Sequence, residues 1–364
     1  MMIKQVFLSD ILKFKNGKKR PKEGGTVPVY GGNGILGYSN SSNSEECIII
    51  GRVGAYCGNV YYEKNKCWIS DNAISAYVKE GIDIVYAYYL LKSLHLNKRK
   101  IGTSQPLLTQ EILNNIETPI IPYFNQIKVG KILSIIDEKI YLNTEINNNL
   151  EQQAQAVYYK MFSEVNTVPV ELSSIIDVRD GTHDSPKAQA TGYYLITSKH
   201  LLPFGVDKAS ANYISKADFN KINERSLVET QDILMSMIGT IGLISYIPYE
   251  TVDFAIKNVA LFKTSHTPEL AYYFLCYLKS EKTLQHIEKC LAGSTQKYIS
   301  LGELRKMPIY SPTTNEIREF NCLVKPMFEK IVSRTYENAL LAEMRDSLLP
   351  KLMSGELDVS DIDI

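Results

Sequence analysis

An internal repeat extends over most of this sequence. The segment GTSQPLLTQEILNNIETPIIP (102–122) and the segment GSTQKYISLGELRKMPIYSP (293–312) share a Gly, hydroxyl residues, a Gln, a leucine-containing stretch and two prolines. The two segments lie 191 residues apart. A repeat of this length predicts two copies of one folding unit rather than a single larger domain.

The repeat continues on both sides of these segments. VFLSDILKFKNGK (6–18) resembles VELSSIIDVRDGT (170–182) at an offset of 164, and Gly54 corresponds to Gly239 at an offset of 185. The second copy is therefore about 27 residues longer, mostly between its first segment and Gly239. Offsets that change only within loops are expected after duplication and divergence.

Each copy ends in a helical segment with a coiled-coil pattern. Seam positions three and four residues apart run through the first segment, at Leu133, Ile136, Ile140, Asn143, Asn147, Leu150, Ala154, Val157 and Met161. The positions 191 residues later are Val324, Met327, Ile331, Arg334, Asn338, Leu341, Arg345, Leu348 and Leu352. Because the flanking positions are polar and the two seams match, we expect the helices to pair with each other, antiparallel, rather than each to pack on a globular core.

The expected helices are long and not purely apolar along the seam. A helix of about 40 residues is a rod of roughly 60 Å. The polar seam residues cost stability and are expected to fix the register of the pair. Pro326 predicts a kink or a delayed start of the second helix.

The part of each copy that precedes its helix is predicted to be rich in strands. In the first copy, ECIIIGRVG, NVYYEK, CWIS and AISAYV are short β-branched and aromatic runs broken by Gly and Asn. Shorter helices are expected at 84–96 and 269–279. The sequence therefore predicts an α+β fold with two globular α/β domains, related by a pseudo-two-fold axis and separated by a long antiparallel two-helix coiled coil.

Composition and charge limit the class of protein. Hydrophobic residues make up 45% and charged residues 22% of the chain, as in ordinary soluble proteins. Without a signal-like N-terminus or a long apolar run, a cytoplasmic protein is expected, and the six cysteines are expected to be free thiols. The net charge is zero, but residues 1–124 hold 15 Lys and Arg against 10 Asp and Glu. Cations can thus gather on one surface of a neutral chain.

The sequence contains no familiar catalytic motif. A phosphate-binding G-x-x-x-x-G-K-[ST] loop, an H-E-x-x-H zinc motif and a G-x-S-x-G nucleophile elbow are all absent. A methyltransferase cofactor loop and its Asn/Asp-Pro-Pro-aromatic motif are also missing. We therefore expect no catalytic residue, no metal and no bound cofactor, although an enzyme with an unfamiliar site remains an alternative.

Loops rich in glycine and cations instead indicate nucleic-acid recognition. KFKNGKKRPK (13–22) places six cations in ten residues and is followed by the glycine-rich VPVYGGNGILGY (27–38). Glycine allows the backbone to approach a phosphate, and Asn and Arg can hydrogen-bond base edges. In the first copy the candidate DNA contacts are Lys15, Lys18, Lys19, Arg20, Tyr30, Asn33, Arg52, Tyr56, Lys98, Arg99, Lys100, Ser104 and Gln105. In the second copy they are Arg179, Thr182, His183, Ser185, Ser198, Lys199, His200, Thr240, Lys257, Asn258, Thr295, Gln296, Lys297 and Tyr298.

Together these features resemble the specificity (S) subunit of a type I restriction–modification system. The resemblance rests on VPVYGGNGILGY, IIIGRVGAYCGNV, WISDNAI, the repeated Gln-containing segments, and the helix ends YYKMFSE and LLPKLMSGEL. It implies a target recognition domain at 1–123, a central helix at 124–164, a second target recognition domain at 165–312, a C-terminal helix at 313–357 and a tail at 358–364.

The resemblance also implies a function and partners. Each target recognition domain would read one half of a bipartite, asymmetric target in double-stranded DNA. The helices would set the spacing and hold two methyltransferase (modification) subunits, which restriction/translocase subunits would join. S-adenosylmethionine, ATP and Mg would be bound by those partners only, and no membrane is involved. The alternative is a two-headed protein scaffold that does not bind DNA.

Overall fold

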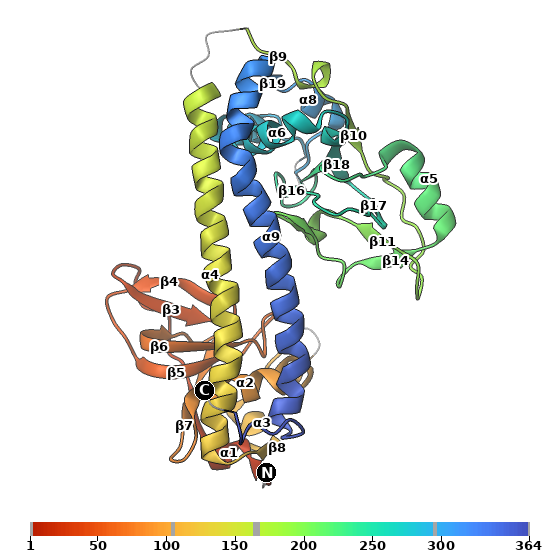
Figure 1. The fold of residues 1–364 in the computed structure, drawn as a ribbon. Helices are drawn as coiled ribbons and strands as arrows, with labels where there is room; N and C mark the ends of the chain where they lie inside the picture. The colour runs from red at the N-terminus through yellow and green to blue at the C-terminus, as the bar shows by residue number, and fades with distance from the viewer. Residues whose placement is uncertain (1–2, 103–105, 163–167, 294–296, 363–364) are drawn as a thin grey trace. The chain divides into compact units, whose positions relative to one another are not determined.

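The computed structural model describes residues 3–102, 106–162, 168–293 and 297–362 (Figure 1). The chain divides into two compact units. Unit 1 contains Met1–Leu142 and Asn338–Ile364, and unit 2 contains Asn143–Glu337. No helix among the described residues is both long and apolar enough to cross a membrane.

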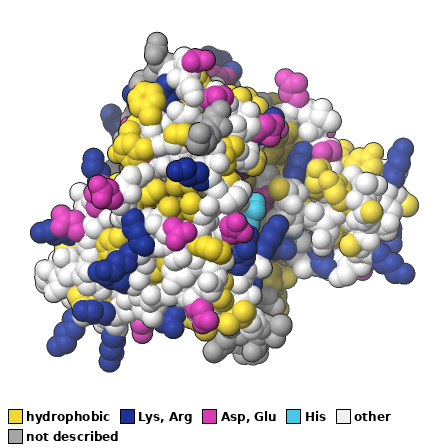
Figure 2. Space-filling view, turned by 90° about the horizontal axis from the view of Figure 1, so that it is seen from below, with side chains coloured by type: hydrophobic (Ala, Val, Ile, Leu, Met, Phe, Trp, Pro, Cys, Tyr) yellow, Lys and Arg dark blue, Asp and Glu magenta, His cyan; other side chains and the backbone are white. Residues whose placement is uncertain are grey.

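Unit 1 is built on a six-stranded sheet. Its strands, in spatial order, are β2 (Leu12–Asn16), β7 (Ala73–Val78), β5 (Ser44–Gly51), β6 (Val60–Ile69), β3 (Val27–Gly31) and β4 (Gly34–Ser39). Two of the predicted runs, NVYYEK and CWIS, form the single strand β6, because pairing with β5 continues to Cys67 with only an irregularity between Glu45 and Cys47. Lys and Arg side chains, with Asp and Glu among them, stand out from the surface of this unit (Figure 2).

Helix α2 (Ile84–Ser93) covers the sheet of unit 1 and buries Tyr86, Tyr89 and Leu90. At the start of this helix, the Asp83 side chain accepts a hydrogen bond from the Tyr86 amide at 2.8 Å and so caps the helix. It ends earlier than the predicted residue 96, because His95 adopts a left-handed φ of 46° before a short 3-10 turn. The predicted helix is thus confirmed except for its last residues.

Unit 1 also contains a two-stranded sheet and two short helices. Strands β1 (Lys4–Phe7) and β8 (Glu117–Ile120) form an antiparallel pair, and the short helices are α1 (Leu8–Ile11) and α3 (Gln110–Asn114). The predicted tail also belongs to this unit. Val359 is fully buried, and the Asn125 amide donates a hydrogen bond to the Ser360 hydroxyl at 3.0 Å.

Unit 2 contains two main sheets and a segment that unit 1 lacks. One sheet has the order β10 (Val178–Asp180), β18 (Val259–Phe262), β15 (Ile233–Ser236), β16 (Ile244–Tyr246), and the other β14 (Asn212–Ile214), β11 (Tyr193–Ile196), β17 (Phe254–Ile256). Two-residue strands pair as β12 (Leu201–Leu202) with β13 (Gly205–Val206) and β9 (Val170–Glu171) with β19 (Pro308–Ile309). The helices are α5 (Lys216–Ser226), α6 (Ala271–Leu278), α7 (Glu281–Lys289) and α8 (Leu301–Arg305). Strands β11 and β14 and helix α5 lie within the stretch where the second copy is longer.

The two long helices, α4 (Tyr123–Phe162) and α9 (Thr314–Met353), have 40 residues each. Their first residues are 191 positions apart in the sequence, and so are their last residues. In unit 1, Arg345 forms an ion pair with Asp137 at 2.6 Å, and the Asn338 amide donates to the Ile140 carbonyl at 3.3 Å. Residue numbers that increase along α4 therefore pair with residue numbers that decrease along α9, which confirms antiparallel pairing.

The pairing in unit 2 has the same direction. The Asn143 amide donates to Glu337 at 2.8 Å, and the Asn147 amide lies 3.5 Å from the Thr335 hydroxyl. Every predicted seam residue is at least half-buried. The buried ones are Leu133, Ile136, Asn143, Ala154, Val324, Ile331 and Leu352, and the half-buried ones are Ile140, Asn147, Leu150, Val157, Met161, Met327, Arg334, Asn338, Leu341, Arg345 and Leu348.

The sequence predicted that Pro326 would kink the second helix or delay its start, and the delayed start is wrong. Helix α9 begins at Thr314 and continues through Pro326. Proline removes one backbone hydrogen bond and clashes with the preceding turn. Val324 and Phe328, on either side of it, are fully buried, so side-chain packing holds the helix together at this point.

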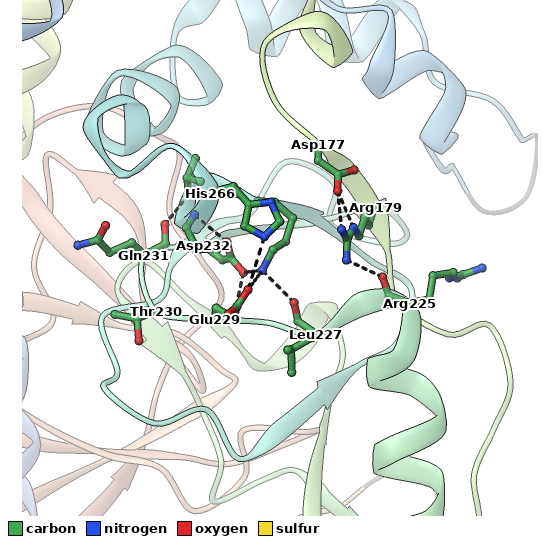
Figure 3. A network of polar contacts seen from close by, with 12 residues as sticks. Asp177, Arg179, Arg225, Leu227, Glu229, Thr230, Gln231, Asp232 and His266 are labelled. Carbon is green, nitrogen blue, oxygen red and sulfur yellow. Dashed lines mark hydrogen bonds and ion pairs between the residues drawn. The ribbon is translucent and has the colours of Figure 1, made fainter.

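An ion cluster with two buried members, Lys263 and Asp232, and one exposed member, Glu229, fixes the segment that leads into β15 in unit 2 (Figure 3). The Lys263 ammonium donates to the carboxylates of Glu229 at 2.7 Å and Asp232 at 2.6 Å, and to the Leu227 carbonyl at 3.1 Å. Asp232 also accepts hydrogen bonds from the backbone amides of Glu229 and Ser265 at 2.8 and 3.0 Å. Buried charges are tolerated when they are paired and hydrogen-bonded in this way.

Candidate nucleic-acid interface

The candidate site of unit 1 begins where the first basic loop meets the sheet. The Gly17 amide donates to the Ala73 carbonyl and the Lys18 amide to the Ile69 carbonyl, both at 3.0 Å. A Cβ atom on Gly17 would lie 1.9 Å from the Ser70 carbonyl oxygen. Only glycine permits this approach, which places Lys18 at the end of the sheet.

Unit 2 forms the same contact from the corresponding residues. The Gly181 amide donates to Val259 at 2.9 Å and the Thr182 amide to Ile256 at 3.0 Å. A Cβ atom on Gly181 would lie 2.3 Å from the Ile256 carbonyl oxygen. The two donors, Gly181 and Thr182, follow Gly17 and Lys18 at the offset of 164 that the sequence shows. The duplication is therefore visible in individual hydrogen bonds.

A second loop contact is also shared by the two units. In unit 1 the Leu108 amide donates to the Arg52 carbonyl at 2.9 Å, while Ile101 and Leu107 exchange backbone hydrogen bonds of 3.0 and 2.9 Å. The loop after β5 thereby lies against the segment that follows Ile101. Both loops carry predicted contact residues.

In unit 2 the Ile299 amide donates to the Met237 carbonyl at 3.0 Å, and Ala292 and Tyr298 exchange two hydrogen bonds of 2.9 Å. Met237 follows Arg52 by 185 residues, and Tyr298 follows Leu107 by 191. The same backbone frame therefore presents different side chains in the two units.

The glycine contact gives a direct test of this frame. Gly181→Ala should lower the free energy of unfolding by about 1–3 kcal/mol, because the added methyl group forces the loop away from Ile256. Urea denaturation measures this difference. Gly302→Ala is the matched control in unit 2, since its Cβ would meet nothing closer than the Ser300 hydroxyl at 3.7 Å. Equal effects of the two substitutions would contradict the close approach.

Several predicted contacts of unit 1 are brought together at this frame. A Cβ atom on Gly32 would lie 3.6 Å from the Val53 carbonyl and 3.7 Å from the Tyr56 Cβ, so the loop with Asn33 lies beside the loop with Arg52. Asn33 and Tyr56 are exposed. Arg52 is half-buried, and its Nε has no hydrogen-bond partner among the residues that the structure describes.

The cations at 98–100 join the same loops. A Cβ atom on Gly58 would lie 2.3 Å from the Asn97 amide nitrogen, so the loop that contains Arg52 packs against the segment leading to Lys98. Burial raises the pKa of the Cys57 thiol, and the positive charge of Lys100 acts in the opposite direction. Lys98, Arg99 and Lys100 are all exposed.

Other predicted contacts of unit 1 lie elsewhere or are occupied. Tyr30 is only 7% exposed, and its hydroxyl donates to Glu63 at 2.9 Å. Burial raises its pKa, and Glu63 adds to this. We remove Tyr30 from the candidate DNA contacts because its strand lies between β6 and β4. Lys15 and Lys19 are exposed, with the Lys15 ammonium 4.9 Å from the centre of the Tyr77 ring, and Arg20 pairs with Glu23 at 2.7 Å.

In unit 2 the predicted contacts form a polar group at the same frame. His183 Nδ1 lies 2.8 Å from the Asn258 side-chain oxygen, and its Nε2 lies 3.0 Å from an Asp180 carboxylate oxygen. The Lys257 ammonium donates to the Ser185 hydroxyl at 2.5 Å. A cavity of about 300 Å³ beside them is lined by Asp180, His183, Met237, Ile238, Asn258, Tyr298, Ile299, Ser300 and Leu301.

The remaining predicted contacts of unit 2 differ in their surroundings. His200 is 2% exposed, and its Nδ1 accepts a hydrogen bond from the Thr197 amide at 3.0 Å. Burial lowers the pKa of His200, and we remove this residue from the candidates. Arg179 is half-buried and pairs with Asp177 at 2.7 Å. Ser198 is half-buried, Lys199, Thr240 and Lys297 are exposed, and Ser104, Gln105, Thr295 and Gln296 lie outside the described residues.

Helix α5 contributes residues that the sequence did not point to. With the loop that carries His183 it encloses a cavity of about 520 Å³, to which it contributes Asp218, Lys221, Ile222, Arg225 and Ser226. The Arg225 guanidinium lies 3.0 Å from an Asp180 carboxylate oxygen and donates to the Gly181 carbonyl at 3.0 Å. The extra length of the second copy was the signal for this helix, but its position beside the loop required the structure.

The chain matches one protein family in two regions. The family described as "Type I restriction modification DNA specificity domain" matches residues 3–152 and again residues 165–320. The chain belongs to this family. Its two matched regions follow the two copies of the repeat, which confirms the resemblance that the sequence suggested.

The chain is also similar to specificity subunits of type I restriction enzymes. The specificity subunit of the type I restriction enzyme MjaIX from Methanocaldococcus jannaschii is 25% identical over 338 residues, covering 84% of this chain and 76% of that protein. The specificity subunit of the enzyme EcoprrI from Escherichia coli is 31% identical over 153 residues, covering 40% of this chain and 38% of that protein. Specificity subunits are the non-catalytic components of these systems, so the prediction of a non-enzymatic chain is confirmed.

A solved structure has the same fold. The S subunit of the type I restriction–modification system from M. genitalium superposes with a TM-score of 0.59 at 16% identity, over 97% of this chain and 96% of that one. The predicted fold class is confirmed by this similarity together with the mixed α/β units and the paired helices described above.

Proposed function

We propose that this chain reads a bipartite, asymmetric target in double-stranded DNA, one half-site with the loops of each unit. The observation that carries the proposal is the shared backbone frame with different side chains. Lys18 in unit 1 corresponds to Thr182 in unit 2, and Arg52 corresponds to Met237. Similar frames would let each unit approach a duplex in the same way, and different side chains would give different base preferences.

Within this proposal the chain acts in the cytoplasm and binds no cofactor itself. S-adenosylmethionine belongs to two methyltransferase subunits, and ATP and Mg belong to restriction/translocase subunits that join the complex. The long helices are the proposed platform for the methyltransferase subunits. In unit 1 their surfaces expose large apolar side chains, Ile127, Ile135 and Leu142 on α4 and Leu340 and Met344 on α9. Spacings of eight, seven and four residues place neighbouring members on one face of each helix, and we propose this face as the surface that the partner covers.

Substitution of the exposed residues on α9 tests the platform. Leu340→Asp combined with Met344→Asp should reduce binding of the methyltransferase subunit at least about tenfold, because two carboxylates would have to lose water at the interface. Both side chains are more than half exposed, at 65% and 51%, so the fold should be unaffected. Co-purification and urea denaturation measure these two effects. Unchanged co-purification would place the methyltransferase elsewhere.

Selection from random duplexes tests DNA recognition. The complex of this chain with its methyltransferase subunit should enrich two short sequences at a fixed separation, and neither should appear with the methyltransferase alone. A complex that forms without enriching any sequence would favour the alternative, a two-headed scaffold for proteins. That alternative would also predict binding to other macromolecules with little dependence on salt.

A further inference from the structure

We infer that unit 1 supplies most of the phosphate-backbone affinity for DNA and that unit 2 acts mainly by reading its half-site. This inference rests on the proposed function and concerns how the two loop sets divide the binding. Contacts to phosphates give affinity and orientation, while contacts to base edges give specificity. The shared frame allows the two sets to be compared position by position.

The first comparison is at the loop that contains the glycine contact. Unit 1 has Lys18, Lys19 and Arg20 there; all three are exposed, and Arg20 also pairs with Glu23 at 2.7 Å. The residues 164 positions later in unit 2 are Thr182, His183 and Asp184. Three cations in one unit thus correspond to a hydroxyl, an imidazole and a carboxylate in the other.

The second comparison is at the segment before Ile101 in unit 1 and before its counterpart, Ala292, in unit 2. Unit 1 has the exposed cations Lys98, Arg99 and Lys100, and the positions 191 residues later in unit 2 are Lys289, Cys290 and Leu291. Only one of these three is a cation. Across these two segments, unit 1 therefore has six cations and unit 2 has one.

Some of the cations that unit 2 has in other places have partners within the unit. The Arg225 guanidinium binds Asp180, and the Lys257 ammonium binds the Ser185 hydroxyl. Helix α5 adds Lys216 and Lys221, but it also carries two acidic residues, Asp218 and Glu224. The ion pair with Asp180 and the acidic residues of α5 offset part of this positive charge, which lowers its contribution to DNA affinity.

The side chains that unit 2 offers instead suit base edges. His183 and Asn258 are held at 2.8 Å from each other beside an apolar cavity, and Tyr298 lines the same cavity. Amide and imidazole groups discriminate hydrogen-bonding patterns, and an apolar cavity can receive the methyl group of thymine. Groups held in place by their neighbours lose little conformational entropy on binding.

The salt dependence of DNA binding tests the inference. Each phosphate contact contributes about 0.9 to the slope of log K against log salt concentration. Replacing Lys98, Arg99 and Lys100 together by Gln in the complex with the methyltransferase subunit should lower this slope by about 2–3. Replacing Lys257, Lys289 and Lys297 by Gln should lower it by less than about 1. The first variant should keep the sequence preference of both half-sites.

Three outcomes are informative. Equal slope losses in the two variants, or a larger loss in the unit 2 variant, would overturn the inference. A control variant with Lys325, Lys330 and Lys351 of α9 replaced by Gln removes three exposed charges far along the chain from both loop sets, and it should leave the slope unchanged. If the wild-type complex bound no specific DNA at all, the proposed function itself would fail, which is a different result from unequal or equal slopes.

Discussion

Replacing Lys263 by Ala will lower the free energy of unfolding by about 3–5 kcal/mol. The Lys263 side chain is 1% exposed, and its ammonium lies 2.6 Å from the Asp232 carboxylate, whose side chain has no exposed surface. Without the ammonium, this carboxylate remains in a place that water does not reach. The uncompensated buried charge sets the size of the effect.

Urea denaturation of the wild-type chain and the variant measures this difference. The matched control is Lys325→Ala, because Lys325 is 60% exposed and lies 3.8 Å from Glu329. The control should change the unfolding free energy by less than about 1 kcal/mol. If Lys263→Ala cost no more than the control, the cluster would not hold unit 2 together.

The same cluster gives a pH dependence with a definite sign. The hydrogen bond from Lys263 lowers the pKa of Glu229. The stability from this pairing is therefore fully present above the carboxyl group's unfolded pKa of about 4.3, and it is lost as the pH falls through the lower folded value. Stability measured between about pH 5 and pH 3 should fall less steeply in Lys263→Ala than in the wild type. An equal or steeper fall in the variant would contradict the pairing.

Lengthening the paired helices should change the gap in the DNA target and leave both half-sites unchanged. Seven residues inserted after Leu150 in α4, with seven after Lys330 in the facing part of α9, preserve the coiled-coil repeat. Each helix gains about 10 Å, because an α-helix rises 1.5 Å per residue. At about 3.4 Å per base pair, the gap should grow by about three base pairs.

Sequencing of the methylated sites measures the gap directly. A matched insertion of seven residues in one helix only should disturb the pairing and reduce methylation instead, because the facing seams no longer correspond. An unchanged gap in the double insertion would show that the helices do not set the spacing. A change in the half-site sequences would show that the helices take part in reading DNA.

The sequence predicted the repeat and the helices well because both can be recognised from the order and spacing of residues along the chain. The offsets of 164, 185 and 191 reappear in hydrogen bonds made by Gly17 and Gly181 and by Leu108 and Ile299. The seam positions follow from a helical period that does not require knowledge of the rest of the fold.

Individual contact residues were harder to predict because burial depends on distant parts of the chain. Tyr30 follows a Val-Pro-Val run and precedes two glycines, which looked like a loop, yet it lies in a strand with neighbours on both sides. Lys263 and Asp232 look like ordinary surface charges in the sequence. Their pairing over 31 residues arises only when β15 and β18 come together.

A genome-wide map of N6-methyladenine tests the central claim most directly. The map would compare a host expressing this chain together with its methyltransferase subunit and a host expressing the methyltransferase alone. Our account predicts a two-part motif with a fixed gap that appears only when this chain is present. A complex that forms but produces no new methylated motif would contradict the account.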